Sequence, residues 1–531
     1  MSKRHFGRPA ASAVRRVDLR PLALVAAALL LALLVLMAVA GTPAGALGRE
    51  SATGLAIGHT GHSARAAALR EQARTAQRAH LFTRATALYD RARALYLAAG
   101  ANGRARACLT ARQDMELIGL CYPYTRAGML ELLATRYPDS SAAQRAAWLD
   151  LPSTESLRWD GVTHYYEEVP INLAFRDIAL FQTQTAMVAK YREICDTLKP
   201  YLAVAAATPA WQQYGDPTEY AFTQTLAVPR ANLPASGDLD LWFPLPIEGG
   251  PQTAVQITDP TPAAFIRNPP STASDIGLLA MRIPLQALNG DLGLSFGVAF
   301  SHAAQYFKVD PARVGRYDTR SALYRQYTAS HANTRITPAI SRTARRIVGD
   351  EKNPYLAAKL LYDYVVHTVK YSYVPHLALY PRGEAESVYV HEHKYGDCGA
   401  QSIYFSALCR AAGIPARTPG GFQIFTGTPA SHFWAELYLP NYGWIPVDPT
   451  AATLIDYLPD ESAADRAVFH DFFFANQDDL RLTVQKDTDL PLVPRATGRI
   501  FVPMVVQMPA AWCDTMVEVP LIAIIDGWSF K

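Results

Sequence analysis

Cysteine is scarce in this chain, which has only six in 531 residues. They are Cys108, Cys121, Cys195, Cys398, Cys409 and Cys513. So low a count excludes a small secreted domain built on a disulfide framework. Cys108 and Cys121 are candidates for one pair, although sequence alone does not establish it. The chain must instead fold around hydrophobic cores, and its 50% hydrophobic content is typical of globular proteins.

An excess of charge of one sign is also lacking. The chain has 50 Lys and Arg against 47 Asp and Glu, for a net charge of +3, and no sustained basic stripe, so we predict no nucleic-acid partner. No spacing typical of an EF-hand occurs, and we predict no cofactor. The helical stretch ALYDRARALYLAAG (87–100) has no second copy at a fixed period, which argues against a tetratricopeptide array.

One long uncharged run is present near the N-terminus. The stretch PLALVAAALLLALLVLMAVA (21–40) follows a basic arm that carries six Lys and Arg residues. About 20 apolar residues suffice to cross a bilayer as a helix, and the basic arm favours a cytoplasmic N-terminus. A cleaved signal peptide is the alternative, since Ala44 and Ala46 offer a cleavage site. Both interpretations place the rest of the chain outside the cytoplasm, either membrane-anchored through residues 21–40 or secreted.

The remaining sequence predicts an α+β protein of several domains. Apolar residues recur at helical spacing after residue 64, whereas short runs such as LDLWFPLPIEGG (239–250) are interrupted by Pro, Gly and Asp, as in antiparallel strands. The predicted parts are a basic arm and apolar segment (1–46), a linker (47–63), a helical domain (64–208), a small antiparallel β domain (209–310) and a catalytic domain with a C-terminal extension (311–531).

The stretch KYGDCGAQSIYFSALCRAAGIPAR (394–417) predicts a helix that begins at Cys398. Asp397 is a good N-cap, and Gly413 with Pro415 ends the helix. A thiol in the first helical turn is expected to have a lowered pKa, because free N–H groups and the helix dipole stabilise the thiolate. The neighbouring Asp397 opposes that effect, so a further cation is needed.

A thiol at this place has four possible roles: disulfide partner, metal ligand, buried filler or nucleophile. The metal alternative rests on His391, Glu392 and His393, which precede Cys398 and offer ligands that Zn²⁺ prefers. No second ligand pair follows at finger-like spacing. We therefore interpret these residues as an exposed loop beside a cleft and predict no metal site. Cys409 is expected to face the core.

A base for the thiol is predicted in SHFWAELYLPNYGWIPVDPT (431–450). Two β runs flank the turn PNYG, which indicates a hairpin. His432 and Asp448 are 16 residues apart, so a hairpin centred near Pro440 would place them opposite each other on one face. His432 would then serve as a base, with Asp448 fixing its tautomer.

These motifs, in this order, resemble the transglutaminase-like superfamily. The resemblance rests on GDC before a helix, RAAGIPAR (410–417), SHFWAELYL (431–439) and NYGWIPVDPT (441–450), and is specific across about 355–450. LWFPLP (241–246) and FFFANQDDLRLTVQKDTDLPLVP (472–494) extend it more weakly. The resemblance implies a papain-like α+β core in which a helix bearing the cysteine packs on an antiparallel sheet.

By the same resemblance, Cys398 is the nucleophile, His432 the general base and Asp448 the residue that orients it. The expected function is an exported cysteine acyltransferase, amidase or protease that attacks an amide carbonyl of a peptide or protein through a thioester. The Cys398 N–H is a candidate oxyanion donor. The alternative is a catalytically silent surface scaffold on the same fold. The oligomeric state is not predicted.

Overall fold

A computed structural model describes residues 52–496, 507, 509–513 and 525–530. The predicted membrane or signal segment (21–40) lies outside these residues. Within them, no helix combines the length and the apolar character needed to span a bilayer. The described residues from His59 onward form one compact unit.

The first part of this unit is mostly helical. Its helices are α2 (Ala52–Arg78), α3 (Phe82–Ala98), α4 (Asn102–Cys121), α5 (Arg126–Arg136), α6 (Ala142–Leu149), α7 (Val169–Arg176), α8 (Ile178–Gln182) and α9 (Thr185–Ala207). A small sheet joins β1 (Tyr124–Thr125), β3 (Val162–Tyr165) and β2 (Ser156–Trp159), in that order. Helix α2 begins at Ala52, inside the range predicted as a linker. Helices α2 to α5 bury a shared core that includes Leu88 and Ala92 of α3.

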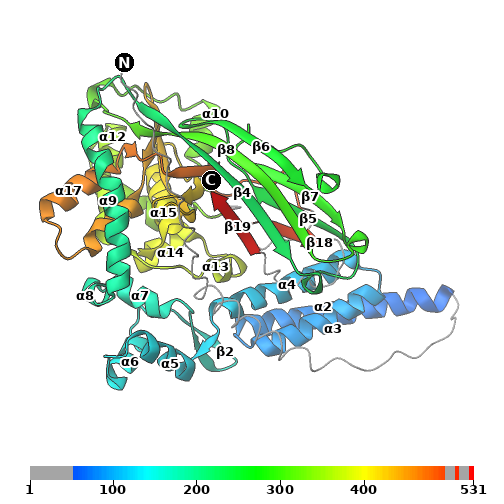
Figure 1. The fold of residues 1–531 in the computed structure, drawn as a ribbon. Coiled ribbons are helices and arrows are strands. Elements are labelled where there is room, and N and C mark those ends of the chain that lie inside the picture. The colour runs from blue at the N-terminus through cyan, green and yellow to red at the C-terminus, as the bar shows by residue number, and fades with distance from the viewer. Residues whose placement is uncertain (1–51, 497–506, 508, 514–524, 531) are drawn as a thin grey trace, which may run out of the picture. The chain divides into compact units, whose positions relative to one another are not determined.

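The middle part is built of antiparallel strands. They are β4 (Tyr214–Val228), β5 (Asp238–Pro244), β6 (Gln252–Thr261), β7 (Leu278–Pro284) and β8 (Leu292–Tyr306), with single-turn helices η1 (Arg230–Asn232), η2 (Ala263–Phe265) and η3 (Leu285–Ala287). The long strands β4 and β8 pair along most of their length, and β6 pairs with the other edge of β8 (Figure 1). Alternating apolar residues from β4, β5, β7 and β8 fill the core of this part.

The last part carries the predicted site. Its helices are α10 (Ala322–Tyr327), α11 (Pro338–Val348), α12 (Pro354–Thr368), α13 (His376–Arg382), α14 (Glu386–His393), α15 (Cys398–Ala411), α16 (Pro449–Ala452) and α17 (Ala463–Phe472), with η4 (Pro311–Arg313) and η5 (Thr453–Tyr457). Its strands are β9 (Lys370–Tyr371), β10 (Tyr395–Gly396), β11 (Ala416–Arg417), β12 (Gly420–Gln423), β13 (Ala430–Phe433), β14 (Ala435–Leu439), β15 (Gly443–Val447), β16 (Asn476–Gln477) and β17 (Arg481–Gln485). Two three-stranded antiparallel sheets, β13-β12-β17 and β11-β14-β15, adjoin α15.

The C-terminal strands return to the middle part of the chain. Strand β18 (Ala510–Cys513) pairs with β5, and β19 (Ile525–Phe530) pairs with β4 (Figure 1). The expected α+β architecture, with a helical N-terminal region and several small antiparallel sheets, is thus confirmed in its broad outline. The end of the chain therefore adds strands to sheets whose first strands, β4 and β5, begin at Tyr214 and Asp238.

Candidate active site

Cys398 is the first residue of α15, as the local sequence predicts. The Asp397 side chain caps the helix, because its Oδ1 accepts a hydrogen bond of 3.1 Å from the Ala400 N–H. The chain leaves the helix at Gly413, whose φ of +79° favours glycine. Residues 399–410 are all buried, so α15 is surrounded by protein rather than covered along one stripe. Cys409 faces the core, and this prediction is confirmed.

The predicted hairpin forms, but its register differs from the prediction. In the structure, β14 and β15 pair with Ala435 opposite Val447, so the hairpin is centred on Asn441 rather than Pro440. His432 lies outside the hairpin, on β13, where it pairs with Gly421 of β12. The prediction that His432 and Asp448 are opposite partners of one hairpin is therefore wrong. The chain changes sheets between β13 and β14, a feature that residue spacing does not reveal.

The two side chains nevertheless meet. His432 Nε2 lies 2.7 Å from Asp448 Oδ2, and both residues are buried. Asp448 immediately follows β15 and caps α16, where its Oδ1 accepts hydrogen bonds from the Ala451 N–H at 2.9 Å and the Thr450 hydroxyl at 3.2 Å. These two bonds leave Oδ2 to receive the imidazole. The carboxylate is thus held at a helix N-terminus, where negative charge is favoured.

A buried arginine completes this carboxylate's environment. Arg481 Nη1 donates to Asp448 Oδ2 at 2.6 Å, and Nη2 donates to Asp478 Oδ2 at 2.7 Å. Burial raises the pKa of Asp448, but the charges of His432 and Arg481 and the hydrogen bonds outweigh that effect and hold its pKa well below the usual range. Asp448 is therefore an anion at any ordinary working pH.

An ionised Asp448 determines the tautomer of His432. A carboxylate only accepts hydrogen bonds, so Nε2 of the ring must carry a proton. Nδ1 is then the atom that can accept a proton from the nucleophile. Trp434 stacks beside the ring at 6.2 Å between centroids, and Phe425 meets it edge-on at 6.1 Å. These contacts limit rotation of the imidazole.

Cys398 lies next to this pair. The backbone N–H of Phe433, the residue after His432, faces the Cys398 thiol and lowers its pKa. A β-carbon placed at Gly399 would lie 3.4 Å from the Phe433 ring, which shows how closely β13 approaches the start of α15. Within the described residues, no hydrogen bond joins the thiol to the imidazole. The structure therefore brings His432 and Asp448 into direct contact and places Cys398 beside the strand that carries His432.

The thiol is not activated by its surroundings alone. Burial raises the pKa of Cys398 well above its usual value, and the charge of Asp397 raises it further, while the Phe433 and Gly399 N–H groups lower it. The lowering expected from the helix start is present in the Gly399 N–H, but desolvation of the half-buried thiol and the opposing charge of Asp397 outweigh it. These surroundings favour the thiol over the thiolate, so a base that accepts the proton would assist the reaction.

The metal alternative gains no support from the geometry. Residues 391–393 form the end of α14 rather than an exposed loop, and His391 Nδ1 lies 3.0 Å from the Tyr404 hydroxyl. Glu384, Glu392 and His393 bring ligand-type atoms within 4.8 Å of one another, but two of the three residues are exposed. Glu384 also accepts a hydrogen bond from Arg382. Exposed acidic groups commonly gather in this way without an ion.

All six cysteines are free, including the candidate pair Cys108 and Cys121, both of which are buried in α4.

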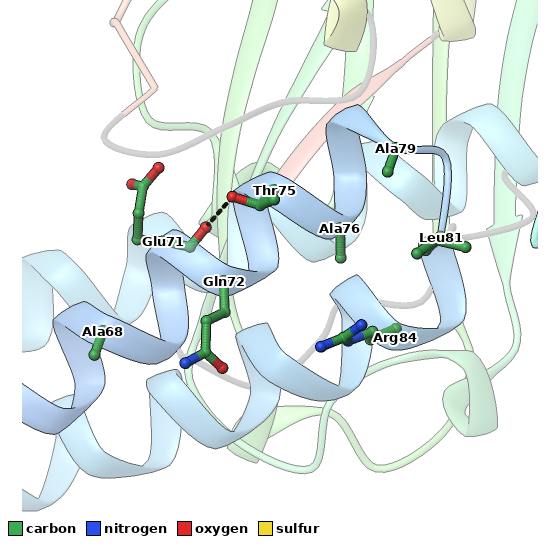
Figure 2. Close-up of a pocket in the computed structure, with 8 residues that line it drawn as sticks. All are labelled: Ala68, Glu71, Gln72, Thr75, Ala76, Ala79, Leu81 and Arg84. Atoms are coloured by element: carbon green, nitrogen blue, oxygen red, sulfur yellow. Dashed lines mark hydrogen bonds between the residues drawn. The ribbon is translucent and has the colours of Figure 1, made fainter.

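A pocket of about 390 Å³ lies between α2 and the start of α3, away from the site residues. Figure 2 shows its lining of small side chains such as Ala68 and Ala76, with Glu71 and Arg84 as its charged groups. Cys398, His432 and Asp448 are not among the residues that line this pocket.

Two charged residues of the site were missed in the sequence. Arg481 stands in a run with strand character, 33 residues after Asp448, and the only hint was its closeness to Asp478. His376 lies 21 residues before Asp397, yet its Nε2 is 2.6 Å from Asp397 Oδ2. No spacing rule connects such positions. The sequence predicted a need for a further cation near the thiol, but it did not indicate His376.

Comparison with known proteins bears on this part of the chain. Residues 341–449 match the transglutaminase-like superfamily. The uncharacterized protein YebA of Bacillus subtilis (strain 168) is 23% identical over 187 residues, which make up 32% of this chain and 25% of that protein. The chain thus spans about a quarter of the length of this relative.

Two solved structures are also similar. One, from Cytophaga hutchinsonii and provisionally named a cysteine protease, has 13% identity and a TM-score of 0.38, and the match covers 60% of this chain and 99% of that one. The periplasmic domain of TgpA from Pseudomonas aeruginosa has 17% identity and a TM-score of 0.22, and the match covers 48% of this chain and 98% of that one.

The range that matches the superfamily, residues 341–449, includes Cys398, His432 and Asp448. Residues 341–449 of this chain are therefore a transglutaminase-like superfamily core.

Proposed function

We propose that the chain is an exported cysteine enzyme that cleaves or exchanges amide bonds through a thioester. The sulfur of Cys398 attacks the amide carbonyl carbon while His432 Nδ1 accepts the thiol proton. The tetrahedral intermediate collapses as His432 returns that proton to the departing amine, which leaves an acyl group on the sulfur. Water or a second amine then attacks the thioester, again with His432 as base, and the thiol is regenerated.

The observation that carries this proposal is the buried His432–Asp448 hydrogen bond of 2.7 Å beside the start of α15. It supplies a base of defined tautomer next to a thiol that does not ionise unaided. Arg481 keeps Asp448 anionic, so the imidazolium formed during attack is stabilised where it arises. Because Cys398 begins α15, its N–H has no acceptor within the helix and is available for the oxyanion.

Features of the sequence near the N-terminus support a location outside the cytoplasm. The basic arm and the uncharged run 21–40 are typical of an anchor or a signal segment. The substrate class that follows is an extracytoplasmic peptide or protein amide, with hydrolysis as the default reaction because water is always at hand. Protease added to intact cells is expected to digest the catalytic part, whereas a cytoplasmic marker protein should stay protected.

A substrate screen tests the activity. The purified protein is incubated with a library of peptides containing amide side chains and backbone bonds, with and without a labelled primary amine, and the products are identified by mass. Hydrolysis yields a new acid, whereas acyl transfer yields the labelled amide. Both products should disappear with Cys398→Ala and persist with Cys409→Ala, which removes a buried thiol from the other end of α15. Products that persist in Cys398→Ala would refute Cys398 as the nucleophile, and a wild-type protein inert to every substrate would favour the scaffold alternative.

A further inference from the structure

The carboxylate beside the nucleophile is fully engaged. Asp397 is buried, and its Oδ1 caps α15 through the Ala400 N–H. Its Oδ2 accepts a hydrogen bond of 3.3 Å from the Val374 N–H and lies 2.6 Å from His376 Nε2. One buried anion thus has two tasks: it starts the helix that carries Cys398, and it raises the pKa of that thiol. The second effect works against catalysis.

His376 bridges two buried carboxylates. Its Nε2 contacts Asp397, and its Nδ1 lies 2.7 Å from Glu386 Oε1. The carboxylate side chains are 9% and 3% exposed, so both are largely removed from water. If both ring nitrogens donate to these carboxylates, the ring carries two protons and a positive charge.

We infer that His376 is a positioning residue: as an imidazolium held between Glu386 and Asp397, it offsets the negative charge beside Cys398 and so favours proton transfer from the thiol to His432. This inference rests on the proposed role of Cys398 as nucleophile. It adds a second histidine to the site, which acts on the sulfur through Asp397 and touches no substrate.

The electrostatics of the surrounding groups agree with this role. Burial lowers the pKa of His376, but the Asp397 and Glu386 carboxylates outweigh burial and raise it well above its usual value. The pKa of Asp397 is lowered in spite of its burial, chiefly by the His376 charge. Burial raises the pKa of Glu386 more than the charge and hydrogen bond of His376 lower it, and the charges of Asp397 and Glu384 add to the increase.

Three tyrosines also face this cluster, and none of them alters its charge near neutral pH. Desolvation raises the pKa of Tyr373 to about 12 although the residue is 39% exposed, and it raises those of Tyr166 and Tyr371 further still. The remaining charge that acts on the thiol comes from Asp448, which also raises its pKa and is itself paired with His432 and Arg481. His376 is therefore the cation in direct contact with Asp397 among the described residues.

The helical part of the chain holds this arrangement in place. The Asn172 side chain on α7 donates to the Tyr373 carbonyl at 3.0 Å and accepts from the Tyr373 N–H at 2.8 Å. The Tyr166 hydroxyl donates to the Val374 carbonyl at 3.1 Å. The segment fixed by these bonds supplies the Val374 N–H to Asp397 and leads directly into His376. The region before residue 208 thus supports the nucleophile rather than standing apart from it.

The test is a double-mutant cycle on the rate of Cys398 alkylation. Iodoacetamide labelling is followed by peptide mapping between about pH 7 and pH 9.5 in the full chain, with Cys398→Ala as the blank. His376→Gln keeps an N–H donor for Asp397 but removes the charge. Loss of the positive charge that offsets Asp397 should raise the pKa of the Cys398 thiol by about 1. Labelling of Cys398 should then be about tenfold slower at a given pH. His367→Gln, on an exposed histidine of α12, is the matched control and should label at the wild-type rate.

Asp397→Asn distinguishes charge from structure. Asn caps helices as well as Asp does, so α15 should remain intact. Without the anion, Cys398 should label faster than in wild type, and His376→Gln should have no further effect in this background. Slower or unchanged labelling of Asp397→Asn, or the same tenfold loss from His376→Gln in both backgrounds, would overturn the inference. If His376→Gln does not fold, the rate of Asp397→Asn alone decides.

These outcomes are separate from those of the proposed function, because alkylation requires no substrate. A cycle that behaves as expected in a protein inert to every amide would leave the His376 inference standing and refute the proposed activity. Cys398-dependent turnover, together with labelling of His376→Gln at the wild-type rate, would support the proposed activity and refute the His376 inference.

Discussion

Arg481→Met is predicted to destabilise the site region strongly. The Arg481 side chain is fully buried, and it bonds Asp448 at 2.6 Å and Asp478 at 2.7 Å. Its guanidinium also lies 5.1 Å from the Phe425 ring and 5.3 Å from the Trp434 ring. Met fills a similar volume but leaves two buried carboxylates without their cation. Removing one partner of a buried ion pair costs about 3–5 kcal/mol.

The chain has several core clusters, so its global unfolding need not be a single transition. Hydrogen exchange followed by mass spectrometry is therefore the better assay, read on peptides that cover β15 and β17. A loss of about 3–5 kcal/mol corresponds to an opening equilibrium larger by roughly 100- to 5,000-fold.

Arg192→Met is the matched control. Arg192 pairs with Asp460 at the surface, where the two side chains are 36% and 64% exposed. An exposed pair contributes about 0–1 kcal/mol, so exchange near Arg192 should change little. Adding Asp478→Asn to Arg481→Met should restore part of the lost protection, because one of the two uncompensated charges is removed. Equal, small changes in Arg481→Met and Arg192→Met would refute the view that Arg481 holds the two carboxylates.

Three further predictions concern the same part of the fold. Gly421→Ala should disrupt the β13-β12-β17 sheet and cost about 1–3 kcal/mol or more, because the new Cβ would lie 1.9 Å from the Leu482 carbonyl oxygen. In the control Gly293→Ala on β8, the new Cβ meets nothing within 4 Å, so the thermal unfolding of the two variants should differ clearly. Asp448→Asn should lower kcat by about 10²- to 10⁴-fold while leaving residual turnover, because the imidazole keeps a hydrogen-bond partner but loses its preferred tautomer. Turnover at the wild-type level would contradict the role of Asp448 in orienting His432. The stability of the folded protein should fall on acidification below about pH 4, because the pKa values of Asp397 and Asp448 are lowered by folding. The stability that these two carboxylates contribute is present above their unfolded pKa and is lost as the pH falls. Urea midpoints that stay constant from pH 6 to pH 3 would contradict this prediction.

The parts of the site that sequence predicted correctly are those set by local rules. Asp397 caps and Gly413 ends α15, because capping and left-handed turn residues act within one helical turn. The triad candidates came instead from the resemblance to the transglutaminase-like superfamily. Their roles as nucleophile, base and orienting residue remain predictions.

The parts that sequence did not predict depend on contacts between distant segments. His432 lies on β13, which pairs with β12, so it reaches Asp448 from another sheet rather than across a hairpin. Arg481 and His376 arrive from β17 and α13, and nothing in their neighbouring residues indicates a buried ion pair. For the thiol pKa, the sequence indicated the opposing effects of the helix start and of Asp397, but not the desolvation that adds to the effect of Asp397. Helix position can be inferred from sequence, whereas the partial burial of Cys398 depends on the packing of the whole domain.

The most direct test of the central claim is to trap the acyl group on the sulfur. A peptide amide that turns over is mixed with the protein, quenched in acid within milliseconds to seconds, and the digest is mapped by mass. We expect an acyl adduct on Cys398 that forms with the burst of released amine in wild type, and forms far more slowly in His432→Ala. An adduct on another residue, or steady turnover with no adduct on Cys398 at any time, would contradict it.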